Sequence, residues 1–263
     1  MKAQTENKSV DLKKTNNVAV AYDLAEWGEA PALGQDTIIP KILPMQPTSV
    51  MVTEGKAVMG EFRDSLSGAK LGSIVEPLEV LPFHLEKFWD IYIFDNKSDK
   101  FEWQGAEPLI ENPAQAGYND NLPWSDKTAD GVEMKRVRRM NFYVMLPSEL
   151  AAGGTVPYIL SFKSTSFREG KKMFTQMYFR NKASHLPPPA YTFKLSGVKQ
   201  KNEKGVFIVL NVELGRASTK PEITACLEWF RIIKKGGVKI DDSDLNVSDA
   251  AFADVDDTGA GKF

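Results

Sequence analysis

The order of strand-like and helix-like segments limits the folds that this 263-residue chain can adopt. Residues 79–94 are rich in β-branched and aromatic side chains and alternate in character, which predicts a long strand that is broken or bulged near Pro82. The same signals predict a hairpin partner and four further strands. They lie at residues 101–103, 135–146, 158–162, 191–198 and 206–214.

Two capping boxes mark the starts of helices. In this motif a hydroxyl and a carboxylate three residues later satisfy exposed backbone donors. The pairs Ser166–Glu169 and Thr219–Glu222 both match it. Apolar residues then recur at helical spacing, up to about Lys182 after the first box and up to Ile233 after the second.

The resulting order is strands, one helix and two more strands. An OB-fold, a small barrel that binds single-stranded nucleic acid on one face, has three strands, a helix and two strands. We therefore predict a mainly β fold: an OB-fold-like five-stranded barrel with an inserted helix, extra N-terminal strands and a C-terminal helix. A domain of about 200 residues has ample core for this.

Composition divides the chain into three segments. Residues 1–35 are polar and are expected to form a loosely ordered arm, residues 36–240 the nucleic-acid-binding domain, and residues 241–263 a disordered acidic tail. Cys226 is the only cysteine, which excludes an intramolecular disulfide and a cysteine-based zinc site. No apolar run has the length of a membrane span. We expect a protein without a membrane partner that works in a reducing cytoplasm.

The tail, residues 241–263, gives the most specific indication of function in the sequence. It carries seven aspartates and a single base, Lys262, and it ends on an aromatic residue. A flexible anionic strand that ends in a phenyl ring and a carboxylate suits a partner pocket with apolar walls and a basic rim, and it also mimics nucleic acid. A solubilising tail is the alternative. The residues concerned are Asp241, Asp242, Asp244, Asp249, Asp254, Asp256, Asp257 and Phe263.

Charge elsewhere in the chain has the opposite sign. The whole chain has 33 basic and 35 acidic residues, so without the tail's seven acids and one base it has 32 against 28, a net charge of +4. Residues 134–182 hold ten bases against Glu149 and Glu169. A basic body with an acidic tail indicates a surface that binds a polyanion.

Bases and aromatic rings in this part of the chain are the candidate nucleic-acid-binding residues. Lys and Arg follow phosphates and exposed rings stack on bases in sequence-independent single-strand binding. The predicted groove residues are Lys135, Arg136, Arg138, Arg139, Lys163, Arg168, Lys171 and Lys172, and the predicted stacking rings are Trp89, Tyr92, Trp103, Tyr143 and Phe162. A strand that is covered on both faces would explain the same alternation of aromatic residues around Trp89.

The sequence does not support an enzyme. The two histidines, His84 and His185, are far apart in the chain and fit no metal-ligand spacing. The glycines near the end of the chain lack the spacing of a phosphate loop. We expect no catalytic residues, no metal site and no cofactor.

The basic, aromatic-rich β segment, the acidic residues 241–257 and the terminal Phe263 together resemble the single-stranded-DNA-binding proteins of bacteriophages and bacteria. The resemblance implies a protein that coats single-stranded DNA in phage DNA replication, recombination and repair, in the host cell cytoplasm. It implies a tail that restrains DNA binding and recruits partners such as a polymerase, a helicase-primase or a recombinase. Residues 259–262 are less acidic than that family's tails.

Two functions of other classes stay open at this stage. One is a phage protein that modulates transcription by contacting RNA polymerase, and the other is a virion or scaffold protein. In the second case the basic segment is only a solvated face. The sequence also leaves open whether the chain forms a homodimer.

Overall fold

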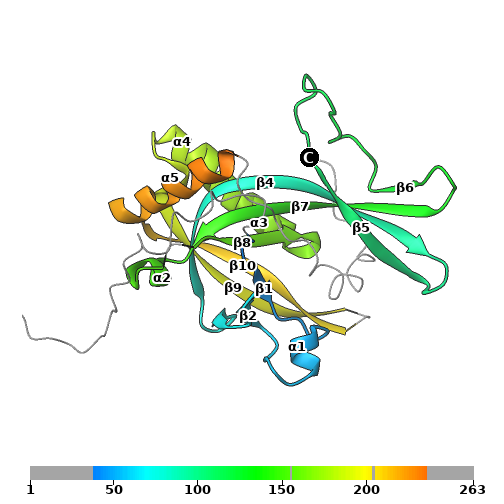
Figure 1. Cartoon of the computed structure of the whole chain (residues 1–263), viewed down its shortest axis with the longest axis horizontal. Coiled ribbons are helices and arrows are strands. Elements are labelled where there is room, and N and C mark those ends of the chain that lie inside the picture. Colours follow the sequence, from blue (N-terminus) through cyan, green and yellow to red (C-terminus); the bar gives the residue numbers. More distant parts are fainter. Residues whose placement is uncertain (1–37, 155, 203–204, 236–263) are drawn as a thin grey trace, which may run out of the picture. The chain divides into compact units, whose positions relative to one another are not determined.

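A long, bent strand organises the described part of the chain. The computed structural model describes residues 38–154, 156–202 and 205–235, all within one unit, Leu33–Phe263. The predicted arm at residues 1–35 and the acidic tail at residues 241–263 lie outside the described residues. Figure 1 shows two antiparallel sheets with a few helices, which confirms the mainly β fold class.

The long strand is β4 (Leu78–Asp95), and it has partners on both edges. One edge pairs first with β9 (Tyr191–Asn202) and further along with β5 (Lys100–Pro108). Its other edge pairs with β7 (Glu133–Met145), and the register of that ladder shifts between Pro82 and His84. The predicted irregularity at Pro82 is therefore confirmed, as expected for a residue without an N–H to donate to the ladder.

The seven-stranded sheet follows the order β8-β7-β4-β9-β10, with β5 and β6 as additional strands beside β4 and β7. The remaining strands are β6 (Ser125–Lys127), β8 (Tyr158–Lys163) and β10 (Gly205–Ala217). The helical segment lies in the chain between β8 and β9, so the predicted order of three strands, a helix and two strands is present. No ladder joins β8 to β10 within the described residues, so backbone ladders do not close the predicted OB-fold-like arrangement of five strands into a barrel.

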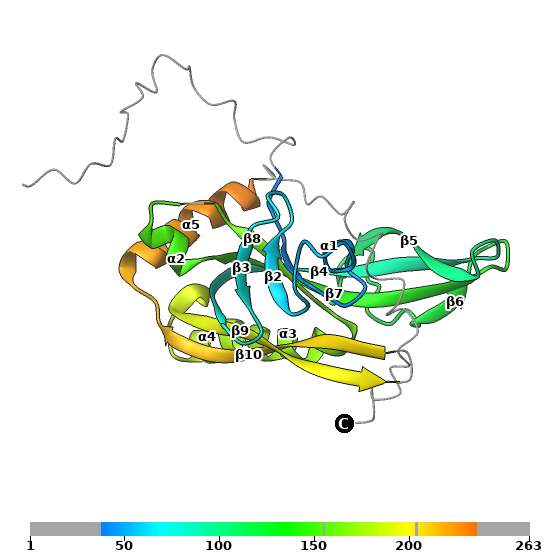
Figure 2. The same cartoon turned by 90° about the horizontal axis from the view of Figure 1, so that it is seen from below.

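The N-terminal part of the described chain forms a smaller sheet. It consists of β1 (Ile42–Pro44), β2 (Glu61–Asp64) and β3 (Lys70–Ser73). An isolated parallel bridge between Lys41 and Ile159 connects it to β8. Figure 2 shows β2 and β3 side by side, and Phe62 of β2 shares a core with Leu195 of β9 and Leu210 of β10.

Apart from α3 (Phe167–Phe174) and α5 (Lys220–Lys234), the helical segments are short. The short ones are α1 (Val50–Thr53), α2 (Pro147–Ala151), the 3-10 turn η2 (Ser164–Ser166), the π-helical turn η3 (Thr175–Arg180), α4 (Asn181–Ala183) and the 3-10 turn η4 (Pro188–Ala190). The segment from α3 to α4 is one continuous helical run and confirms the helix that we predicted up to Lys182.

The two predicted capping boxes have different outcomes. At Thr219 both hydrogen bonds are present and α5 begins as predicted. At Ser166 neither is formed. Ser166 Oγ instead accepts a hydrogen bond from the N–H of Leu210 (3.1 Å), and Glu169 Oε2 accepts one from the N–H of Val212 (3.3 Å).

Side chains thus occupy the outer edge of β10, where a neighbouring strand would pair. The N–H of Ile208 donates to Gln46 Oε1 (2.8 Å), so three alternate amides of this edge have side-chain acceptors. We call these acceptors, Gln46, Ser166 and Glu169, the side-chain seam. A satisfied edge does not offer a template for pairing with another chain.

Alternate residues of β7 fill two separate cores. Phe142 packs with Met173 of α3 in the first, and Tyr143 packs with Cys226 of α5 in the second. β7 is therefore covered on both faces. Cys226 is buried, and burial raises the pKa of its thiol to about 12.

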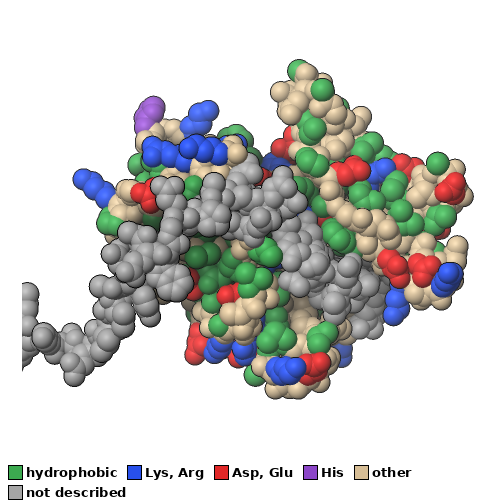
Figure 3. All heavy atoms as spheres, viewed as in Figure 1, with side chains coloured by type: hydrophobic (Ala, Val, Ile, Leu, Met, Phe, Trp, Pro, Cys, Tyr) green, Lys and Arg blue, Asp and Glu red, His purple; other side chains and the backbone are tan. Residues whose placement is uncertain are grey.

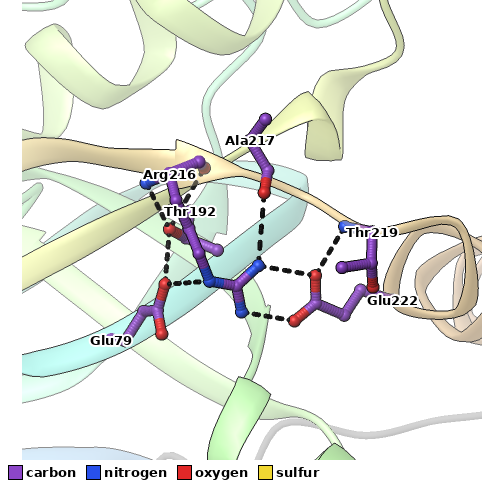
Figure 4. A network of polar contacts seen from close by, with 6 residues as sticks. All are labelled: Glu79, Thr192, Arg216, Ala217, Thr219 and Glu222. Atoms are coloured by element: carbon purple, nitrogen blue, oxygen red, sulfur yellow. Dashed lines mark hydrogen bonds and ion pairs between the residues drawn. The ribbon is translucent and has the colours of Figure 1, made fainter.

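A polar network fastens the end of β10 to α5 and β4. The guanidinium of Arg216 donates two hydrogen bonds to Glu222 (2.6 and 3.0 Å), and its Nε lies 3.1 Å from Glu79 Oε1. Thr192 Oγ1 donates to the same Glu79 oxygen (2.7 Å), as Figure 4 shows. The Arg216 guanidinium, assisted by the N–H of Thr219, lowers the pKa of Glu222 from 4.5 to about 2.

Acidification should remove the contribution of Glu222. Because its pKa in the folded protein lies below the ordinary value, its stabilisation is complete above about pH 4.5 and is lost as the pH falls towards 2. We expect Glu222→Gln to lower the free energy of unfolding by about 1–2 kcal/mol at neutral pH, since Arg216 is partly exposed, and by almost nothing near pH 2. Urea unfolding across this pH range measures the difference. Glu228→Gln on the exposed side of α5 is the control, and a difference that does not change with pH would contradict the assignment.

Candidate nucleic-acid interface

The structure separates the eight predicted groove bases into two groups. Lys135, Arg136, Arg138 and Arg139 lie on β7, with Lys163 at the end of β8. Arg168, Lys171 and Lys172 lie on α3 and are exposed. The two groups have different surroundings and support different roles.

Arg139 does not line a groove. Its side chain is 1% exposed, its Nε lies 3.2 Å from Asp90 Oδ1, and its guanidinium carbon lies 5.2 Å from the centre of the Phe88 ring. A buried arginine that is paired with a buried carboxylate is inaccessible to phosphate. The prediction for Arg139 is therefore wrong, because both faces of β7 are covered at this position.

The other bases on β7 hold neighbouring parts of the protein. Arg138 lies 2.7 Å from Asp120 Oδ1, and Arg136 lies 3.2 Å from Asp126 Oδ2. The ammonium of Lys135 lies 3.9 Å from the centre of the Phe101 ring. Lys163 is half-buried opposite Arg139 in the β7–β8 ladder. In this structure these bases therefore interact with other parts of the protein.

The predicted stacking rings are also mostly inside the protein. Four of the five are buried, so they cannot stack on a base in this conformation. They are Trp89, Tyr92, Tyr143 and Phe162. Trp103 is half-buried. The structure thus has the alternative of a strand covered on both faces, and a stacking role for these rings stays a prediction.

Five exposed bases and an exposed ring lie together on the helical run from α3 to α4. The buried side chains of this run face the sheet, among them Glu169, Met173 and Met177. Five bases are exposed on it. They are Arg168, Lys171, Lys172, Arg180 and Lys182. Figure 3 shows Lys and Arg side chains gathered over α4 and α5 on the face in view.

An exposed aromatic ring lies among these bases. Phe179 is 62% exposed, and its ring is perpendicular to that of Phe174, with 5.5 Å between the ring centres. Phe174 in turn lies 5.3 Å from Tyr178, and the ammonium of Lys87 lies 4.3 Å from the centre of the Phe174 ring. We call Phe174, Phe179 and the five bases the helical basic surface.

The π-helical turn η3 positions Phe179. Such turns insert one residue into a helix and are frequent at functional sites. Met177 of this turn is buried, and Tyr178 is anchored by a hydrogen bond to the backbone of Leu85, which together fix the turn against β4. The Phe179 side chain is left on the solvent side.

Sequence reasoning did not select Phe179 and Trp124, the two most exposed large aromatic side chains among the described residues. Trp124 is 55% exposed before β6, and its carbonyl accepts a hydrogen bond from the N–H of Arg136 (2.7 Å). The available signals were a ring in a polar loop for Trp124 and a ring directly before Arg180 for Phe179. Neither signal distinguishes an exposed ring from a buried one.

Comparison with known proteins places the chain in a phage family. The model of the family described as Pam3 phage gp34-like protein matches residues 12–239. The chain belongs to this family. Its membership agrees with the phage origin that the resemblance implied, although it specifies no activity. No curated protein and no solved structure matches the chain.

Two further features of the described residues concern membranes and metals. No described helix is both long enough and apolar enough to cross a membrane. Within the same residues, His, Cys, Asp and Glu side chains form no group of three or more that could hold a metal ion.

Proposed function

We propose that this member of the Pam3 phage gp34-like family is a single-stranded-DNA-binding protein. It coats and protects single-stranded DNA without sequence specificity during phage DNA replication, recombination and repair. The observation that carries the proposal is the exposed Phe179 ring among the five exposed bases of the helical basic surface.

The chemistry of this surface suits a single strand. An exposed ring stacks on any base, because every base has a π-face, and each stack contributes roughly 1–3 kcal/mol. Exposed bases neutralise phosphates and release counterions, so affinity falls steeply with salt. The order of strands and helix, which is that of OB-folds, adds support from the fold.

The proposal includes a regulatory role for the tail. Seven aspartates and a terminal phenylalanine, at residues 241–263, offer the same chemistry as a short stretch of single-stranded DNA. A segment of this length spans about 25–30 Å as a flexible chain. The tail competes with DNA for exposed bases and recruits replication and recombination proteins.

Fluorescence anisotropy of a labelled poly-dT oligonucleotide tests the proposal. We expect the full chain to bind dT more tightly than duplex DNA, with an affinity that falls as salt rises. Phe179→Ala should weaken dT binding about 5- to 150-fold, which is the effect of losing one stacked base. Because Phe179 is mostly exposed, its replacement should leave the unfolding midpoint unchanged.

The control is Leu227→Ala, which removes another exposed apolar side chain from α5. It should leave dT binding unchanged. Absence of dT binding by the wild-type chain at low salt would refute the proposal. Equal affinities of the wild type and Phe179→Ala would show that the helical basic surface is not the binding surface.

A further inference from the structure

The loop after β5 and the first residues of β6 cover a basic and aromatic stretch of the sheet. We call residues 109–126 the covering segment; it appears in Figure 1 as the green chain that leads from β5 into β6. The backbone carbonyl of Asn119 accepts a hydrogen bond from Trp89 Nε1 (3.1 Å), and the carbonyl of Asp120 accepts one from Arg138 (2.9 Å). The guanidinium carbon of Arg138 lies 5.0 Å from the centre of the Trp89 ring. Ring and base are thus stacked together beneath the segment.

The covering segment places a carboxylate on each of three bases of the sheet. The distances between the charged atoms are 2.6, 2.7 and 3.2 Å. The pairs are Glu111 with Lys87, Asp120 with Arg138, and Asp126 with Arg136. These carboxylates occupy the positions at which phosphates of a bound strand would be expected.

In two of the three pairs the carboxylate lies towards solvent and the base beneath it. The side chains of Glu111 and Asp126 are 47% and 46% exposed, whereas those of Lys87 and Arg136 are each 13% exposed. In the third pair both side chains are partly exposed, Arg138 at 37% and Asp120 at 31%. Ion pairs with such exposed partners contribute little to stability in water and are screened by salt. A polyanion that supplies several phosphates at once can therefore replace them.

Hydrogen bonds within the segment hold its first part together, and β6 ties its far end to β7. Asn119 ties it internally: its side-chain oxygen accepts from the N–H of Ile110 (2.8 Å), and its amide donates to the carbonyl of Pro108 (2.9 Å). None of the residues 109–126 is buried. Glycines with positive φ lie on either side, at Gly105 (147°) and Gly131 (80°), and give the backbone freedom at both ends.

We propose that the covering segment is a displaceable mimic of DNA phosphates, and that single-stranded DNA displaces it to reach Trp89, Arg136 and Arg138. This inference rests on the proposed function. The newly opened stretch continues the helical basic surface, because Lys87 contacts both Glu111 of the segment and the Phe174 ring. The two surfaces together form one track of bases and rings for a longer strand.

Neutralising the three carboxylates tests the proposal. We expect Glu111→Gln/Asp120→Asn/Asp126→Asn to bind poly-dT about tenfold more tightly at physiological salt, because DNA phosphates then need not displace carboxylates from the three bases. The matched control is Glu54→Gln/Glu76→Gln/Glu228→Gln, which adds the same net charge at exposed positions elsewhere. Since distant charges are screened, it should stay within about twofold of the wild type.

A second measurement needs no substitution. Hydrogen exchange of residues 109–124 in the wild-type chain should become faster on addition of poly-dT, whereas a fixed loop would show unchanged or slower exchange. Wild-type binding without tightening in the triple variant, or without faster exchange, would refute the displacement of the segment and leave the proposed function intact. A wild-type chain that does not bind dT would refute both.

Discussion

Replacement of Asp90 by alanine should lower the free energy of unfolding by about 3–5 kcal/mol, the usual cost of breaking one partner out of a buried ion pair. Asp90 is fully buried and Arg139 is 1% exposed, so the substitution leaves a guanidinium in the core without its carboxylate. The charge of arginine cannot be relieved by deprotonation, because its pKa is too high. Urea unfolding monitored by circular dichroism measures the loss.

The double variant Asp90→Ala/Arg139→Met distinguishes the pair from simple loss of packing. Removal of both charges should recover most of the stability, since a buried pair is worth little more than apolar side chains of similar volume. Asp126→Ala, which breaks the exposed pair with Arg136, should cost at most about 1 kcal/mol. If Asp90→Ala were as mild as Asp126→Ala, the pair would not be buried as described.

Leucine in place of Gly170 should destabilise the protein by about 3 kcal/mol, at the upper end of the range for overpacked cores. A Cβ atom at Gly170 would lie 2.9 Å from the Cβ of Phe162 and 3.1 Å from its Cγ. Phe162 is fully buried in β8, so its ring cannot move aside without disturbing the first core. The substitution should therefore push α3 away from the sheet.

This displacement has a specific signature. Because Ser166 and Glu169 precede and flank Gly170, the amides of Leu210 and Val212 should lose their acceptors and exchange faster with solvent. Lys171→Leu, at the neighbouring exposed position, should change stability by no more than about 0.5 kcal/mol. A Gly170→Leu protein with wild-type stability and slow exchange at both amides would show that α3 does not approach β8 this closely.

Local sequence signals predicted most elements of the fold. The strand with an irregularity at Pro82 and the helix start at Thr219 are determined by neighbours in the chain, and both are confirmed. The same capping pattern at Ser166 gave a wrong prediction of the cap, because the Ser166 hydroxyl accepts a hydrogen bond from the N–H of Leu210, 44 positions further along. A local sequence pattern identifies a hydrogen-bond partner nearby in the chain. It does not identify a competing partner from a distant part of the chain that folding brings close.

The candidate site was predictable only in part. The bases at Arg168, Lys171 and Lys172 are exposed, as a binding role requires, because a short helix on a sheet leaves one side in water. The rings at Trp89 and Tyr143 are buried, since alternation along a strand does not tell whether its second face is covered. The covering segment lies over Trp89 and α5 lies over Tyr143. The sequence of a strand alone does not reveal which other segments pack on its faces.

The side-chain seam has a consequence for how the fold can vary between related chains. Backbone ladders fix the spacing of strands at about 4.8 Å, so a barrel closed by ladders changes its girth by changing its number of strands or their stagger, and a change of stagger alters the register. Here Gln46, Ser166 and Glu169 span the gap along β10 with side chains of different length. Exchange of a few such residues can therefore widen or narrow the opening between β8 and β10 while every strand and register is retained. Girth in this architecture is adjustable by point substitution.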